Sequence, residues 1–145
     1  MLAELGRRGQ GTRESGAFLL APRDGDRRTV ERVVFLDDLD PDCLTGAIAF
    51  DGAHYGKLWD ICERDDLSVV ADIHTHPGSC VEQSGIDKEN PMIARAGHVA
   101  LIVPDLASKH VSTSEIGVHE YLGDDGWRSW LGADAAKRVY VGSFA

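Results

Sequence analysis

Short apolar runs separated by polar turns dominate the pattern of this chain. The runs that resemble buried strands are, in chain order, residues 17–21, 29–36, 67–73, 98–103 and 116–122, with shorter candidates at 46–50 and 138–141. One amphipathic helix is predicted between these runs, because Tyr55, Leu58, Trp59 and Cys62 recur at i, i+3, i+4 and i+7 and form an apolar stripe. Strands that alternate with helices predict one α/β domain over residues 1–145.

Other segments give weaker structural signals. Residues 1–13 contain three glycines and predict either one helical turn or a partly disordered start. A helix is expected from Ser84 or Asp87 to about Ala96, provided that Pro91 lies in its first turn. The Gly- and Asp-rich residues 123–126 predict a turn, and residues 127–131 predict a short helical or packed segment.

Composition narrows the possible partners and compartment. The chain has 145 residues, 43% of them hydrophobic, and a net charge of −9, which disfavours nucleic acids and anionic membranes as partners. No apolar run approaches the roughly 20 residues of a membrane span, and the first residues lack the apolar core of a signal peptide. Three cysteines without a paired spacing predict no disulfide framework and fit a reducing cytoplasm.

Two histidines end the most apolar strand. His74 and His76 are two residues apart, so a strand would direct both side chains to one face while Thr75 turns away. Pro77 and Gly78 stop the strand, and the loop that follows returns Asp87. Two imidazoles and one carboxylate commonly hold a catalytic zinc ion with one position left for water. The alternative is a histidine pair that only packs beside an ordinary helix start.

The complete motif resembles that of the JAMM (MPN+) metalloproteases. Their pattern is His-Ser/Thr-His-x7-Ser-x-x-Asp, and this chain fills every fixed position with His74-Thr75-His76 and Ser84-Gly85-Ile86-Asp87. The resemblance covers roughly residues 14–122. It implies an MPN/JAB fold, similar to that of cytidine deaminases, in which helices flank a curved mixed sheet. It also implies a Zn2+ ion at the sheet edge, held by His74, His76 and Asp87.

A proton carrier is also needed near such a metal. Glu14 is the best candidate, because it precedes an apolar strand that would end beside the histidines, and it matches the upstream glutamate of the family, a general acid/base. Glu4 and Glu31 are competitors. By resemblance, Ser84 donates a hydrogen bond to the developing oxyanion, although Ser84 and Asp87 also fit a helix capping box.

The resemblance suggests a substrate class and a pathway. Small bacterial-type members of the family accompany ubiquitin-like proteins and relatives of activating and conjugating enzymes, some of them in antiphage operons. We therefore expect a zinc isopeptidase or peptidase that deconjugates or processes a ubiquitin-like protein. Two alternatives stay open: a peptidase that processes a sulfur carrier, and a non-catalytic MPN scaffold.

Several chemically active residues lie outside this set. Cys80 lies inside the proposed metal loop, where it is either a bystander or a thiol that regulates the metal. His98 begins a strand and could support the metal site from behind, whereas His110 and His119 receive no metal role. The acidic residues 37–42 predict a solvated loop or, alternatively, a contact surface for a basic partner.

Overall fold

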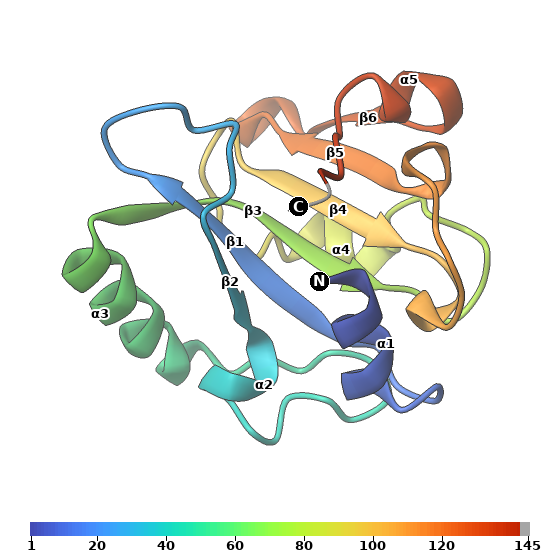
Figure 1. Cartoon of the computed structure of the whole chain (residues 1–145), viewed down its shortest axis with the longest axis horizontal. Coiled ribbons are helices and arrows are strands. Elements are labelled where there is room, and N and C mark those ends of the chain that lie inside the picture. The colour runs from blue at the N-terminus through green and yellow to red at the C-terminus, as the bar shows by residue number, and fades with distance from the viewer. Residues whose placement is uncertain (143–145) are drawn as a thin grey trace.

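Six strands form one mixed sheet in the order β2-β1-β3-β4-β5-β6 (Figure 1). The structure is a computed structural model and describes residues 1–142. The strands are β1 (Gly16–Pro22), β2 (Arg32–Phe35), β3 (Leu67–Thr75), β4 (Val99–Val103), β5 (Gly117–Tyr121) and β6 (Trp127–Trp130). Only β3 and β4 are parallel among these strands. The predicted α/β class with a mixed sheet is confirmed.

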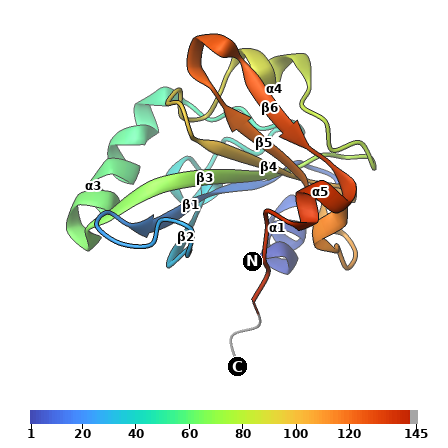
Figure 2. The same ribbon diagram turned by 90° about the horizontal axis from the view of Figure 1, so that it is seen from above.

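Helices cover both faces of this sheet. They are α1 (Leu2–Gly9), α2 (Leu36–Leu39), α3 (Tyr55–Asp65), α4 (Gly85–Glu89) and α5 (Gly132–Ala136). Figure 2 shows α3 on one side of the sheet, with α1 and α5 on the other. The longest of these helices, α3, has 11 residues, so none of the described helices has the length of a membrane span.

The predicted helical stripe forms the inner side of α3. Leu58 is fully buried and Cys62 nearly so, and both join the core between α3 and the sheet. Trp59 is 47% exposed, however, and stacks on Tyr55 with ring centroids 5.9 Å apart. The helix ends at Asp65, and the left-handed backbone of the capping residue Asp66 (φ 52°) closes the last turn.

Ion pairs fasten α1 to the neighbouring segment. Glu4 accepts hydrogen bonds from Arg7 and Arg8, and Arg8 continues to Asp37 and Asp38 at 2.9 and 2.7 Å. Leu5 is fully buried beneath the helix. Residues 2–9 therefore form two helical turns, one more than the single turn expected, and the acidic run 37–42 is partly engaged within the chain.

A bulge in β3 determines which side chains face which layer. β1 pairs with β3 so that Leu19 lies opposite Ala71 but Leu20 lies opposite Val69, which leaves Val70 as an extra residue. Val69 therefore faces α3 together with Phe18 and Leu20, whereas Ala71 and Ile73 pack on the opposite face. After the bulge the side chains alternate again, but the even-numbered residues of β3 now face the α3 side instead of the odd-numbered ones.

Several expected elements are wrong or differ in length. The helix after Ser84 ends at Glu89, because Pro91 cannot donate within a helix and disfavours helical backbone at Asn90. Residues 46–50 make only one isolated bridge, Leu44 to Ile48, and residues 138–141 form no strand. Residues 127–130 form the edge strand β6 rather than a helix.

We expect Leu58→Ala to lower the free energy of unfolding by about 2–5 kcal/mol, because it leaves a cavity under α3. The matched control is Leu131→Ala, at a side chain that is 40% exposed, and it should cost under about 1 kcal/mol. Urea denaturation measures both. Equal losses would contradict the packing described for α3.

Candidate metal centre

Three side chains converge at the end of β3. His74 and His76 come from the strand and Asp87 from the first turn of α4, and their ligand atoms all lie within 4.8 Å of one another. The two Nε2 atoms are 3.2 Å apart, and they lie 3.5 and 3.3 Å from the Asp87 carboxylate. The side chains remain 11–21% exposed, so solvent reaches the cluster.

The cluster lies at the end of β3, where the chain leaves the sheet. Parallel strands need a crossover connection, and the one between β3 and β4 begins directly after Thr75. The strand end is fixed on both sides: the Thr75 backbone N–H donates to the Ser15 carbonyl at 2.9 Å, and the His76 N–H donates to the Val103 carbonyl at 2.9 Å. Thr75 itself is fully buried, as the alternation predicts.

A backbone carbonyl orients His76. Its Nδ1 lies 3.1 Å from the Cys80 carbonyl oxygen, which can only accept a hydrogen bond. The hydrogen therefore resides on Nδ1, and the Nε2 lone pair faces the cluster. This is the usual support for a histidine that binds a metal ion.

A buried carboxylate stands behind His74. Asp72 Oδ2 lies 3.6 Å from His74 Nδ1, and Asp72 Oδ1 accepts a hydrogen bond of 2.7 Å from His98 Nε2. Asp72 and His98 are 3% and 2% exposed. Burial disfavours the charged form of His74, but Asp72 and Asp87 more than offset this and raise its pKa to about 9. The sequence motif does not include Asp72, although its position two residues before His74 on the same strand is a signal that could have indicated this role.

Ser84 holds the third ligand in place. Its hydroxyl donates to Asp87 Oδ2 at 2.7 Å and accepts from the Asp87 backbone N–H at 3.1 Å, while its own N–H donates to the same carboxylate at 2.7 Å. The expected capping box is thus present. Burial raises the pKa of Asp87, but His74, His76 and Ser84 outweigh it, and the carboxyl stays ionised. An oxyanion role for Ser84 stays a prediction.

The edge of the sheet supports the loop between the ligands. His119 Nε2 donates to the Val81 carbonyl at 2.9 Å, so its Nδ1 can accept from the Ser129 hydroxyl at 2.8 Å. A β-carbon at Gly117 would lie 2.1 Å from the same carbonyl oxygen, so only glycine allows this approach. No sequence motif includes His119, so this role could not be predicted from the sequence.

The backbone of Glu14 lies near the strand end that bears the histidines, and its carboxylate is not part of the group formed by His74, His76 and Asp87. It comes two residues before Gly16, which pairs with His74, and its backbone N–H donates to the Gly46 carbonyl at 2.7 Å. The competing Glu31 directly precedes β2 and lies alongside the other end of β1, where its N–H donates to the Leu20 carbonyl at 2.9 Å. The carboxylate of Glu4 is occupied by arginines.

The remaining candidates do not contribute ligands to the cluster. Within residues 1–142, His74, His76 and Asp87 form the sole group of this kind. The Cys80 thiol is exposed, and His54 lies 3.5 Å from Asp40 at another part of the surface. Two oriented imidazoles and an ionised carboxylate suit a divalent cation, and three protein ligands leave one position open.

Comparisons with known proteins support the fold but identify neither a family nor a function. No family model matches the chain. The chain is similar to the solution structure of protein DSY2949 from Desulfitobacterium hafniense, with 25% sequence identity and a TM-score of 0.61. The match covers 90% of this chain and 83% of that one. The mixed α/β architecture thus occurs in a solved structure.

We expect Asp72→Asn to weaken Zn2+ binding by about 10- to 100-fold, because the amide no longer attracts the Nδ1–H of His74. Competition with a chromophoric chelator measures the affinity, and circular dichroism checks the fold. The isosteric control Asp66→Asn alters an exposed carboxylate and should bind Zn2+ like the unaltered protein. Equal affinities for both variants would contradict the role of Asp72.

The three cysteines should differ sharply in reactivity toward a thiol reagent at pH 8. Burial raises the pKa of the Cys43 thiol to about 11 and also raises that of Cys62, whereas Cys80 is exposed. The Cys80 thiol should therefore react fast, and the Cys80→Ser variant should lack this fast phase of the reaction. Three equal rates in the native protein would show that the cores around Cys43 and Cys62 are open.

Proposed function

We propose that this chain is a zinc-dependent peptidase or isopeptidase of the JAMM type. The observation that carries the proposal is the convergence of His74, His76 and Asp87 at one sheet edge, together with the full spacing of the family motif. Hydrogen bonds or ion contacts orient each of the three side chains, so little rearrangement is needed to bind a cation.

Zn2+ at this site would lower the pKa of bound water and polarise a carbonyl group. His74, His76 and Asp87 would hold it with a combined protein charge of about −1, because both histidines bind metals in their neutral form. The exposure of the cluster leaves a path for water and substrate. A structural zinc site would instead use four protein ligands.

Glu14 would carry the proton in this reaction. It would accept a proton from the attacking water and donate it to the leaving amine, as general acid/base catalysis requires. Its place two residues before β1, next to the strand that bears the histidines, supports this assignment. Glu4 is less suited, because its carboxylate is paired with Arg7 and Arg8.

Ser84 would serve two purposes. It orients Asp87 in the described conformation, and rotation of its hydroxyl would allow it to donate to the oxyanion of the scissile amide. The rotation costs one hydrogen bond, but the Ser84 N–H continues to hold the carboxylate. Hence Ser84→Ala should impair turnover more than metal binding.

The substrate we propose is a ubiquitin-like protein, cleaved from a lysine side chain or from a peptide that extends its C-terminus. Relatives of activating and conjugating enzymes would be the pathway partners, as in bacterial antiphage systems. This choice rests on the motif resemblance, and the geometry is compatible with any amide that reaches the open side of the cluster.

Cleavage of a panel of ubiquitin-like fusions and sulfur-carrier fusions tests the proposal. We expect the zinc-loaded protein to cleave at least one ubiquitin-like fusion, and a chelator to abolish cleavage. Glu14→Gln should reduce cleavage by at least about 100-fold while Zn2+ still binds, because it removes only the proton carrier. The matched control Glu31→Gln should retain activity.

Four results would count against the proposal. Cleavage that survives chelation would exclude metal catalysis, and equal activity of Glu14→Gln and the unaltered protein would exclude Glu14. Zinc binding without cleavage of any fusion would favour a non-catalytic MPN scaffold. Cleavage of sulfur-carrier fusions alone would identify sulfur carriers as the substrate class.

A further inference from the structure

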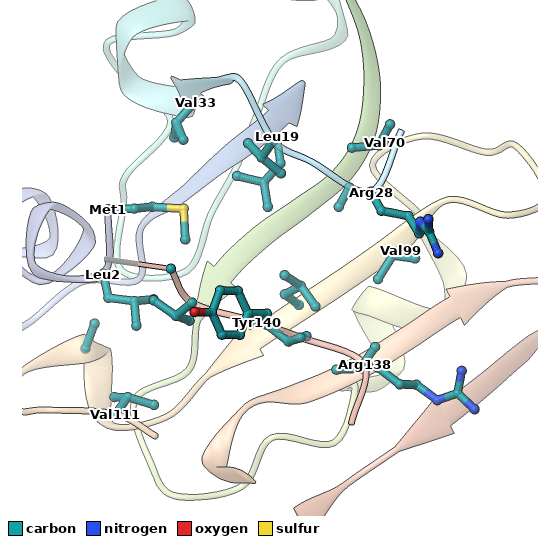
Figure 3. A pocket seen from close by; sticks show the side chains of 18 of the residues that line it. Met1, Leu2, Leu19, Arg28, Val33, Val70, Val99, Val111, Arg138 and Tyr140 are labelled. Carbon is teal, nitrogen blue, oxygen red and sulfur yellow. The ribbon is translucent and has the colours of Figure 1, made fainter. Parts of the chain in front are cut away.

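An apolar groove lies on the sheet face opposite the metal cluster. Its floor includes Leu19, Val33, Val70 and Val99, and α1 forms one wall (Figure 3). Leu19 belongs to the core on that face, whereas His74 pairs with Gly16 on the α3 side. The groove is therefore separated from the metal cluster by the thickness of the sheet.

The size of the groove suits a polypeptide segment. Its volume is about 2260 Å³, whereas sites for small ligands usually measure about 300–1,000 Å³. A helix of about 12 residues is roughly 18 Å long and 10–12 Å wide, which amounts to roughly 1,400–2,000 Å³. The groove is thus larger than a small ligand needs, and its volume is of the order of that of one amphipathic helix.

The margin of the groove is basic although the chain is acidic. Its net charge is −9, yet the acidic residues that line the groove are only Glu31 and Glu120. The cationic side chains that line it are Arg7, Arg27, Arg28, Arg95, Lys109 and Arg138. This distribution would attract a segment that carries aspartate and glutamate beside its apolar face.

Three of these arginines have no carboxylate partner within residues 1–142. Arg27 makes no ion pair there, and Arg95 donates only to the Val69 carbonyl at 3.2 Å. Arg138 lies over the Trp130 ring at 3.7 Å. Tyr140 adds apolar surface at the mouth of the groove, where it is 92% exposed (Figure 3). Arginines beside exposed aromatic side chains are typical of binding surfaces.

A concave site argues against a flat lipid surface. Leu19 is 4% exposed and Leu101 is 8% exposed, so the floor is recessed below the arginines. A helix can enter such a groove with its apolar face, as in many helix-in-groove complexes. A second copy of this chain would have to offer an amphipathic acidic helix, and the described helices are either short or, in α3, already packed on the sheet.

We propose that this groove, lined by Leu19, Val33, Val70 and Val99 and bordered by Arg27, Arg95 and Arg138, binds an amphipathic, acidic helix of a separate protein. The apolar side chains of that helix enter the groove, and its carboxylates meet the arginines. Because the groove and the metal cluster lie on opposite faces, the partner stays bound without blocking the cluster.

Selection from a phage-displayed library of random 16-residue peptides on the full chain tests this proposal. Enriched peptides should combine an apolar stripe at i, i+3, i+4 and i+7 with an excess of Asp and Glu. A synthetic copy should bind the double variant Arg27→Glu/Arg95→Glu at least about tenfold more weakly. The control Arg64→Glu, on α3, should bind it unchanged, and all forms should retain Zn2+ binding.

Other outcomes would overturn the proposal. No enrichment, enrichment of basic peptides, or equal binding to the double variant would remove the acidic helix as the occupant. Sedimentation with phosphatidylserine vesicles that the double variant loses would assign the groove to a membrane instead. A dimer in light scattering that the double variant dissociates would assign it to a second copy of this chain.

Discussion

The pairing of the buried Asp72 carboxylate with His74 and His98 is the interaction on which the candidate site depends. An ionised carboxylate with 3% exposure is costly unless it is paired, and here His98 and His74 lie on either side of it. The pairing ties the segment before β4 to β3 and orients the imidazole that faces the cluster. Packing around Asp72 and the orientation of His74 are therefore inseparable, and a change made for stability in this region also changes the candidate metal site.

Much of the candidate site was predictable because its signals are local. Alternation along a strand puts His74 and His76 on one face, and a Ser-x-x-Asp step at a helix start brings the two side chains together. The α/β class followed from the succession of apolar runs, and the stripe of α3 from its period. None of these inferences requires knowledge of distant contacts.

What could not be predicted depends on pairing between distant segments. Nothing near His119 in sequence indicates that it holds the Val81 carbonyl, since 38 residues separate them. Trp127–Trp130 became a strand because β5 offered a free edge, although the segment alone is ambiguous. The helix after Ser84 was predicted to reach about Ala96 on the condition that Pro91 lies in its first turn, but the helix begins at Gly85, so Pro91 falls beyond that turn and ends the helix.

The extra residue at Val70 has a consequence for how this fold can change. It lets the first half of β3 contribute Val69 to the core under α3 while the second half directs Asp72 and His74 to that same side. If the strand kept all of its residues but paired regularly, without the bulge, the histidines would instead face the arginine-bordered side. Homologous chains that keep the length of this strand but lack the bulge would thus share the overall fold but not the position of the histidines, and a comparison of folds alone would miss the difference.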